Sequence, residues 1–535
     1  MFSKRDTAGR SSPTQRRSVV VVGAGMGGLA AALLLGARGH AVTVVEKNAQ
    51  PGGKLRDIPV GGRRIDSGPT VFTMRWVFDA LFAAVGASVD EHLKLSRAEI
   101  LARHSWPDGS TLDLHADRAA SADAVGSLSG ARDAKGYLAF CQRTEEVFQS
   151  LNASFMENPS PSPIGLARNA GLGGLVALAR IKPFTALSKV IEDYLQDPRL
   201  RQLFGRYATY CGSSPFEAPG PLMLIAHVEQ TGVWLVEGGM MRIAETLERL
   251  ARTVGVRFCY GADVREIMVQ ERAAAGVRLT SGEELRADAV VFNGDPAALF
   301  SGLLGEAAKP AVAAWKPKER SLSAVTWSVN ARAAGFPLSR HTVFFSGDYA
   351  REFADILGDL SLPADPTIYV CAQDRDASAA GISPAGDEGL LLLVNAPARA
   401  DDRPLSQLEI ATCETRVMKR LARAGLNLSA AAGQSVLTTP SDFAALFPGS
   451  GGALYGRASH GWAASFQRPG ARTPIKGLYL AGGAVHPGPG LPMAALSGSH
   501  AAQAVMADLA STASFHMVAT PGGMSTRSAK TPTMH

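Results

Sequence analysis

The chain has 535 residues, 46% of them hydrophobic and 19% charged, which is long enough for two or three globular domains with large cores. Its net charge of +6 comes entirely from residues 1–17 and 512–535, both rich in Ser, Thr, Gly and Pro. We therefore predict two disordered tails, a nearly neutral folded body and no nucleic-acid partner. Five scattered cysteines without a C-x-x-C pair argue against a metal site and indicate a reducing cytoplasm.

A buried strand and a glycine turn are predicted first. The valine run 19–22 is typical of a strand buried on both faces of a parallel sheet. Gly23, Gly25 and Gly28 follow as G-x-G-x-x-G, a spacing that allows a tight turn, close approach to a pyrophosphate and close helix packing.

A helix and a second strand complete this unit. Residues 29–37 predict the helix, and residues 41–45 predict a strand that ends in Glu46. A carboxylate at that position can accept hydrogen bonds from both ribose hydroxyls of a dinucleotide. The order of strand, glycine turn, helix, second strand and terminal acid predicts a dinucleotide site, with a glycine-rich structural turn as the alternative.

A second glycine loop follows at Gly52 and Gly53, with Lys54 as a cation beside it. This loop could bring backbone and charge to a phosphate. The alternative is the start of a hairpin around Gly61 and Gly62.

Residues 76–210 are predicted to be mainly helical, with a strand pair at 100–115, and to form an insertion suited to a substrate domain. The stretch 158–191 contains no Asp or Glu and combines basic with apolar residues. Such a segment suits docking on an anionic membrane surface, whereas a plain core helix is the alternative.

The nucleotide domain is predicted to resume at a helix over 240–253 with one apolar face. Strands follow at 256–260, 262–267, 276–280 and 287–292, which places Val264 near an adenine.

Residues 321–398 have strand composition and are followed by a predicted helix over 405–424. Within this block Asp374 and Arg375 indicate either an ion pair or a substrate contact.

The C-terminal module repeats the strand, glycine turn and helix. Residues 478–481 predict a buried strand, Gly482 and Gly483 a turn, and residues 493–505 a helix of small residues. A second glycine turn far from the first suits the ring and ribityl end of a flavin, so FAD is favoured over NAD.

The predicted fold class is α/β: a two-dinucleotide-binding, Rossmann-like flavoprotein domain with an inserted mixed β-sheet substrate domain and a helical lid. The FAD-binding domain is assigned to 18–75, 220–310 and 440–511. The lid and part of the substrate domain are assigned to 76–219, and the β-rich substrate domain to 311–439.

Three stretches together resemble the bacterial phytoene desaturase family of FAD-dependent carotenoid desaturases: VVVVGAGMGGLAAALLLGARGHAVTVVEKNAQPGGK, WLVEGGMMRIAETLERL and LYLAGGAVHPGPGLPMAALSG. The stretches GFPLSRHTVFFSGDYAREF, PTIYVCAQDR, LLLLVNAPA and LYGRASHGWAASFQRPG are similar to the branch of 1-hydroxycarotenoid 3,4-desaturases, or methoxyneurosporene dehydrogenases, of purple photosynthetic bacteria. The resemblance covers roughly residues 18–510.

The resemblance implies which residues hold FAD. The AMP and diphosphate half would be held by Gly23, Gly25, Gly28, Glu46, Gly52, Gly53 and Lys54, with Val264 at the adenine. The ribityl chain and flavin would be lined by Gly482, Gly483, His486, Pro487, Gly488 and Met493. The acidic residue that many flavoproteins carry in the C-terminal motif is absent, because Gly483 or Ala484 stands there.

The resemblance also implies the reaction. Two hydrogens leave a carbon-carbon single bond at the end of a conjugated polyene, one as a hydride to the flavin and one as a proton. No general base follows from the pattern, and His486 is a weak candidate whose loop is as easily structural. The alternatives are phytoene desaturase, another FAD amine oxidase and, remotely, a non-catalytic protein like the GDP-dissociation inhibitors.

The expected partners follow from the substrate. An acyclic carotenoid dissolves in the membrane, so the resemblance implies a long apolar tunnel and a cytoplasmic protein held peripherally on the inner membrane. The sequence contains no run of about 18 apolar residues, so no membrane-spanning helix is predicted. Oxygen or a quinone would reoxidise the flavin.

Overall fold

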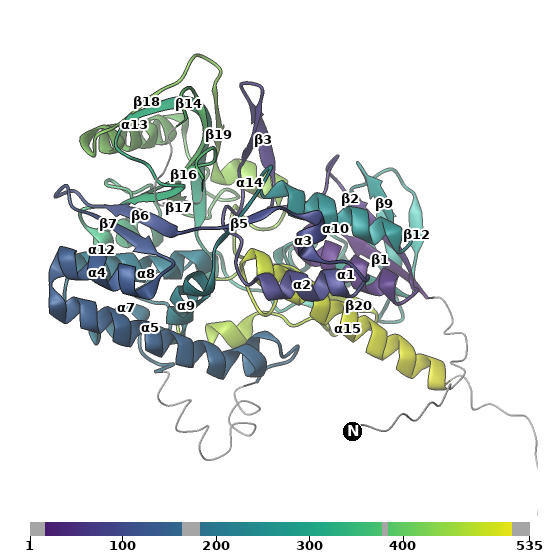
Figure 1. The fold of residues 1–535 in the computed structure, drawn as a ribbon. Coiled ribbons are helices and arrows are strands. Elements are labelled where there is room, and N and C mark those ends of the chain that lie inside the picture. Colours follow the sequence, from purple (N-terminus) through teal and green to yellow (C-terminus); the bar gives the residue numbers. More distant parts are fainter. Residues whose placement is uncertain (1–16, 163–181, 377–383, 516–535) are drawn as a thin grey trace, which may run out of the picture.

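The computed structural model describes residues 17–162, 182–376 and 384–515 (Figure 1). Residues 1–16 and 516–535 of the predicted tails, and residues 163–181 of the acid-free stretch, lie outside the described residues. Helix α15 (Leu491–Phe515) continues four residues into the stretch predicted as C-terminal tail.

A five-stranded parallel sheet forms the first half of the molecule. Its strand order is β20-β13-β1-β2-β9, so the first strand of the chain lies at its centre. The strands are β1 (Ser18–Val22), β2 (Ala41–Glu46), β9 (Arg257–Tyr260), β13 (Ala289–Phe292) and β20 (Leu478–Leu480). Strands from three separate parts of the chain thus make one sheet.

Both faces of this sheet are covered, which explains its uninterrupted apolar runs. Val19 and Val21 face a core made with α1 (Met26–Ala37), α10 (Met241–Thr253) and α15. Val20 instead faces a core shared with a three-stranded antiparallel sheet. That sheet consists of β10 (Val264–Gln270), β11 (Ala273–Leu279) and β12 (Glu284–Arg286).

A larger mixed sheet forms the second half, with the order β18-β14-β17-β16-β15-β6-β7 and β19 paired with β14. Its strands are β6 (Ile100–Ser105), β7 (Thr111–His115), β14 (Ser323–Gly335), β15 (His341–Phe344), β16 (Ile368–Ala372), β17 (Glu388–Ala396), β18 (Leu426–Ser429) and β19 (Ser435–Thr438). Parallel pairing of β6 with β15 joins the predicted strand pair to the β-rich block.

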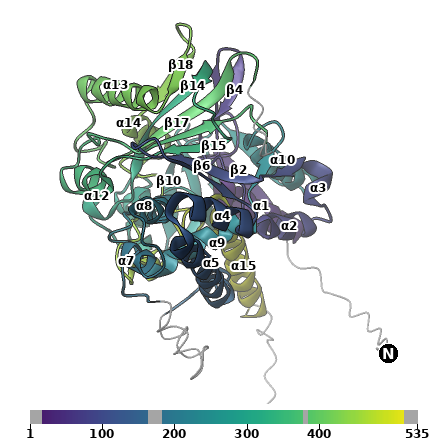
Figure 2. The same cartoon turned by 60° about the vertical axis from the view of Figure 1, so that its left-hand side comes forward.

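This sheet lies between α13 (Gln407–Arg423) and a layer of helices, as Figure 2 shows from the side. Ser406 and Glu409 form a capping box that fixes where α13 begins. The helical layer consists of α4 (Arg118–Ser129), α5 (Ala131–Leu151), η1 (Asn152–Met156), α7 (Leu187–Glu192), α8 (Pro198–Gly205), η2 (Arg206–Cys211), η3 (Gly220–Met223) and α9 (Leu224–Thr231).

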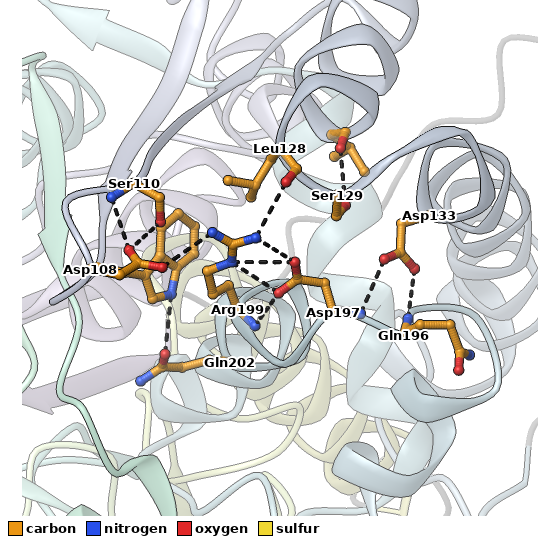
Figure 3. Close-up of polar contacts among 11 residues, drawn as sticks. Asp108, Ser110, Leu128, Ser129, Asp133, Gln196, Asp197, Arg199 and Gln202 are labelled. Atoms are coloured by element: carbon orange, nitrogen blue, oxygen red, sulfur yellow. Dashed lines mark hydrogen bonds and ion pairs between the residues drawn. The ribbon is translucent and has the colours of Figure 1, made fainter.

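A polar network ties the helical layer to the sheet at the start of α8 (Figure 3). Arg199 donates to Asp197 at 2.7 Å and to Asp108, in the turn between β6 and β7, at 3.2 Å. Asp133 of α5 is buried and accepts the backbone amides of Gln196 at 2.6 Å and Asp197 at 3.1 Å. These contacts fix the position of α8 and of η2, which follows it directly.

The remaining elements are short and connect these layers. They are β3 (Asp57–Val60), β4 (Arg63–Asp66), α2 (Arg75–Ala83), α3 (Val89–His92), β5 (Leu95–Arg97), β8 (Trp234–Val236), α11 (Ala297–Phe300), η4 (Glu306–Ala311), η5 (Pro317–Glu319), α12 (Tyr349–Phe353), η6 (Ala354–Gly358), α14 (Pro440–Leu446) and η7 (Ala464–Gln467).

These elements show two features that the sequence had left open. The hairpin around Gly61 and Gly62 does form, as β3 and β4, beside the second glycine loop. Asp374 and Arg375 both make ion pairs, but with separate partners: Asp374 with Arg63, and Arg375 with Glu388.

Candidate functional site

A cavity of about 1210 Å³ is lined by both halves of the molecule. One part of its wall comes from the loops at the carboxyl ends of β1, β2, β13 and β20. The other part comes from the large sheet and from the helical layer. Crevices at the carboxyl ends of parallel strands are the usual ligand sites of such sheets.

The turn after β1 has room for backbone only. A Cβ on Gly25 would lie 2.7 Å from Nδ2 of Asn293, and a Cβ on Gly28 would lie 2.1 Å from the carbonyl oxygen of Gly23. Gly25 is the N-cap of α1 and no side chain caps that helix. The first amides of α1 are therefore directed at the cavity without a side-chain partner, as a phosphate site requires.

Asn293 is a site residue to which the sequence reasoning assigned no role. It directly follows β13, donates to the carbonyl oxygen of Gly23 at 3.3 Å and lines the cavity. Its place at the end of a predicted strand was visible in the sequence, but the pairing of β13 with β1 was not.

Glu46 lies at the end of β2 and lines the cavity. One carboxylate oxygen accepts the amide of Ala24 at 2.8 Å, and the other accepts the amide and the side chain of Asn48 at 2.9 and 2.7 Å. A carboxylate has about four acceptor positions, so capacity remains for a ribose hydroxyl. Val264 also lines the cavity, and the amide of Ala262 on the approach to it donates to the carbonyl of Glu46 at 2.9 Å.

The second glycine loop packs on the first. The amide of Gly52 donates to the carbonyl of Ala24 at 2.8 Å, so the backbones of both loops line the cavity together. Lys54 follows and donates to the carbonyl of Leu454 at 2.6 Å. Burial lowers the pKa of Lys54, and Asp295 partly offsets this effect.

The C-terminal loop closes on the same place. Gly482 follows β20 and has a φ of +112°, a backbone conformation that would be strained in a residue with a side chain. A Cβ on Gly27 would lie 2.7 Å from the amide nitrogen of Gly482. Gly482, Gly483, Pro487 and Met493 line the cavity with the two N-terminal loops.

Three of the predicted site residues do not line the cavity: Gly28, His486 and Gly488. Gly28 instead provides the close contact between α1 and the turn after β1. Gly488 lies against the side chain of Arg468, where a Cβ would be 3.6 Å from Nε.

His486 is buried and joins distant parts of the chain. Its Nε2 lies 3.0 Å from the carbonyl oxygen of Phe155 and 2.9 Å from that of Asn158, and its ring stacks on His500. Burial lowers the pKa of His486 to about 4, so the neutral ring donates to these carbonyls. These contacts favour the structural alternative, and a catalytic role for His486 remains a prediction.

The far part of the cavity is mainly apolar and is built by both the helical layer and the large sheet. Its aliphatic and aromatic lining residues are Leu151, Phe155, Met156, Pro183, Phe184, Pro219, Pro221, Leu222, Leu224, Ile225, Val228, Val343, Leu391, Leu393, Trp462 and Phe466. Such a wall suits a long hydrocarbon.

Polar side chains interrupt this wall, and one group of them carried no sequence motif. Tyr207 and Tyr210 of η2 each donate to a carboxylate oxygen of Glu229 at 2.6 Å. The guanidinium of Arg206 lies over both tyrosine rings, 5.7 and 5.1 Å from their centres. The sequence could not reveal this group because its members come together only when η2 packs against α9.

The paired glycine loops, the uncapped start of α1 and the adjoining apolar chamber define a dinucleotide-dependent oxidoreductase. The sequence model described as flavin containing amine oxidoreductase matches residues 26–506. The chain therefore belongs to the family of flavin-containing amine oxidoreductases. FAD fits the residues present, because the backbone cradle holds no side chain where the diphosphate would lie.

Similar relatives are named for carotenoid substrates. The hydroxyneurosporene desaturase of Rubrivivax gelatinosus is 50% identical over 97% of this chain and 99% of its own length. The hydroxyneurosporene desaturase of Cereibacter sphaeroides is 46% identical over 92% of this chain and 98% of its own length. The 4,4'-diapolycopene oxygenase of a Methylomonas species is 30% identical over 93% of this chain and 99% of its own length. The predicted resemblance to carotenoid desaturases is confirmed.

Solved structures confirm the fold class. An oxidoreductase from Methanosarcina mazei has a TM-score of 0.56 and 18% identity, covering 92% of this chain and all of that one. Putrescine oxidase bound to putrescine has a TM-score of 0.57 and 16% identity, with the same coverage. At these identities the likeness concerns the fold alone, whereas the family assignment confirms the prediction of FAD.

Proposed function

We propose that this protein is an FAD-dependent desaturase that introduces the C-3,4 double bond into acyclic 1-hydroxy or 1-methoxy carotenoids. The observation that carries the proposal is the cavity itself, in which glycine loops suited to FAD adjoin a long apolar chamber. The names of relatives at 43 to 50% identity support this substrate class.

In this proposal the N-terminal loops bind the AMP and diphosphate half of FAD. The amides at the start of α1 would donate to the diphosphate, Glu46 would accept from the ribose, and Val264 would lie at the adenine, since all of these line the cavity. Gly482, Gly483 and Met493, which line the same cavity, would hold the ribityl chain and ring. Lys54 would add a positive charge beside the diphosphate.

The bound flavin supplies the acceptor for a hydride from the substrate. The chain contributes the apolar walls, which hold the polyene extended, exclude water and keep the reacting bond in place. The positive charge that develops on the substrate spreads over the polyene, so proton loss needs only a weak base.

We also propose that the protein docks on the cytoplasmic face of the inner membrane, from which the carotenoid enters the cavity. Phe184 and Trp462 support this, because they line the cavity and yet are 75% and 45% exposed. Their rings contact each other with centres 5.1 Å apart. Exposed aromatic side chains are favoured at membrane interfaces. Oxygen or a quinone from the same membrane then accepts the electrons.

No helix in the described ranges 17–162, 182–376 and 384–515 is long and apolar enough to cross a membrane. Vesicle flotation tests the peripheral contact. We expect Phe184→Ser with Trp462→Ser to reduce binding to anionic vesicles, and unchanged flotation would contradict the contact.

The reaction is tested by incubating the FAD-loaded protein with 1-hydroxyneurosporene and, separately, with phytoene. We expect a red shift of the polyene spectrum with the hydroxylated substrate, because conjugation lengthens. Conversion of phytoene alone would support a phytoene desaturase instead. A colourless protein that takes up no FAD would support a non-catalytic binding protein.

A further inference from the structure

A small polar group with two charged members lies in the wall of the mainly apolar chamber. It consists of Arg206, Tyr210, Glu229 and Tyr349, all of which line the cavity. Arg206 and Glu229 are the only charged residues that the helical layer and the large sheet contribute to the lining within the described part of the chain. Burying charges beside a hydrocarbon costs free energy, so this placement calls for a function.

Contacts within the group account for some of its polar atoms. Both oxygens of Glu229 accept from tyrosine hydroxyls, those of Tyr207 and Tyr210, at 2.6 Å. Burial alone would lower the pKa of Arg206, but Tyr210 and Glu229 raise it, so the guanidinium stays charged. The carboxylate and these two hydroxyls are therefore engaged with each other.

Two further polar atoms of the group are buried without a hydrogen-bond partner among the described residues: Nε of Arg206 and the hydroxyl oxygen of Tyr349. The two side chains belong to neighbouring parts of the wall: a Cβ on Gly205, the residue before Arg206, would be 3.7 Å from Cε1 of the Tyr349 ring. Burial raises the pKa of Tyr349, and the charge of Arg206 opposes that rise. Buried polar atoms without partners are rare in native proteins and point to a bound polar group.

Tyr369 links the group to the loops expected to hold the cofactor, because burial and the neighbouring Tyr210 of the group both raise the pKa of Tyr369. Tyr369 lines the cavity and its hydroxyl lies 2.6 Å from Oγ1 of Thr70. Thr70 stands two residues after Gly68. A Cβ on Gly68 would lie 1.9 Å from the carbonyl oxygen of Lys54, so this turn packs against the second glycine loop. This connection matters because C-1 of the substrate is only two carbons from C-3. An oxygen on C-1 must therefore be bound near the reacting bond.

We propose that Arg206 and Tyr349 bind the oxygen on C-1 of the carotenoid and thereby select oxygenated chain ends over hydrocarbon ends. The inference rests on the proposed function. Nε–H of Arg206 can donate to a hydroxyl or an ether oxygen, whereas the Tyr349 hydroxyl can also accept from a substrate hydroxyl. A hydroxylated end is therefore preferred over a methoxylated one. A hydrocarbon end is rejected because it leaves both protein groups unpaired.

The test uses Tyr349→Phe, which removes one oxygen, and Arg206→Lys, which keeps the charge but removes Nε. Tyr260→Phe is the matched control, since the Tyr260 hydroxyl is also buried but lies outside the cavity lining. For each FAD-loaded protein, kcat/KM is measured with 1-hydroxyneurosporene and with neurosporene.

We expect Tyr349→Phe to reduce the ratio of the two kcat/KM values about tenfold, as loss of one hydrogen bond does, with FAD content unchanged. Arg206→Lys should reduce it as well, and Tyr260→Phe should leave it at the wild-type value. A wild-type ratio in both site variants would overturn the inference.

Binding to the dithionite-reduced holoenzyme separates the two proposals, because the reduced protein cannot turn over. We expect 1-hydroxyneurosporene to bind the reduced wild type more tightly than neurosporene, and Tyr349→Phe to lose this preference. Wild-type protein that binds with this preference but converts neither carotenoid would refute the proposed function while supporting the inference. Equal binding of both carotenoids to the wild type would refute the inference.

Discussion

Gly28 lies so close to Gly23 that a Cβ on Gly28 would be 2.1 Å from the Gly23 carbonyl oxygen. The contact fixes the distance between α1 and the turn after β1. The start of the helix can then direct its amides at the cavity.

We therefore expect Gly28→Ala to shift α1, to destabilise the protein by about 1–3 kcal/mol and to abolish FAD retention, because the added methyl group meets backbone. Urea unfolding and the flavin absorbance of the purified protein measure both effects. Gly126→Ala in α4 is the control, since its Cβ would meet another side chain only at 3.4 Å. A flavin-loaded Gly28→Ala protein of wild-type stability would contradict the expected packing.

The ion pair of Arg375 with Glu388 is almost fully buried, whereas the neighbouring pair of Arg63 with Asp374 is exposed. Arg375→Met should destabilise the protein by about 3–5 kcal/mol, because it leaves the Glu388 carboxylate buried without its cation. Arg63→Ala should cost about 0–1 kcal/mol. Chemical unfolding of both variants checks the difference, and equal losses would contradict it.

The network of Figure 3 makes the position of α8 depend on Asp133. Asp133→Ala should cost about 2–3 kcal/mol, because two backbone amides lose their acceptor. Since Arg206 directly follows α8, turnover of the hydroxylated carotenoid should also fall. The exposed Asp90→Ala should change neither property. Wild-type melting temperature in Asp133→Ala would show that the network does not support α8.

Stability should fall as the pH drops from about 6.5 to about 4. Burial lowers the pKa of both His486 and His500 to about 4, while the unfolded chain binds these protons near pH 6.5. The unfolded state therefore takes up protons first, and each ring costs about 2 kcal/mol at pH 5. Urea unfolding at pH 7 and pH 5 measures the loss. His500→Gln should reduce the dependence on pH, and an unchanged dependence would exclude this pair as its source.

Local patterns in the sequence were enough to predict the first strand-helix-strand unit of the parallel sheet. The valine run, the spacing of Gly23, Gly25 and Gly28, and the terminal Glu46 lie within one strand-helix-strand unit, in which short-range geometry decides the structure. The resemblance extended this to the cofactor and the substrate class. The exact ends of helices were less well predicted. Helix α1 begins at Met26, whereas the prediction began at residue 29, because the glycines in the first turn are poor helix formers.

Only the tertiary structure decided which side chains share the cavity. Asn293 reaches Gly23 because β13 pairs with β1, although 270 residues separate them in the sequence. Glu229 meets Tyr210 because α9 packs beside η2, and His486 is held away from the cavity by two carbonyls of residues 155–158. Such contacts depend on how distant elements pack, and no local spacing of residues encodes that packing.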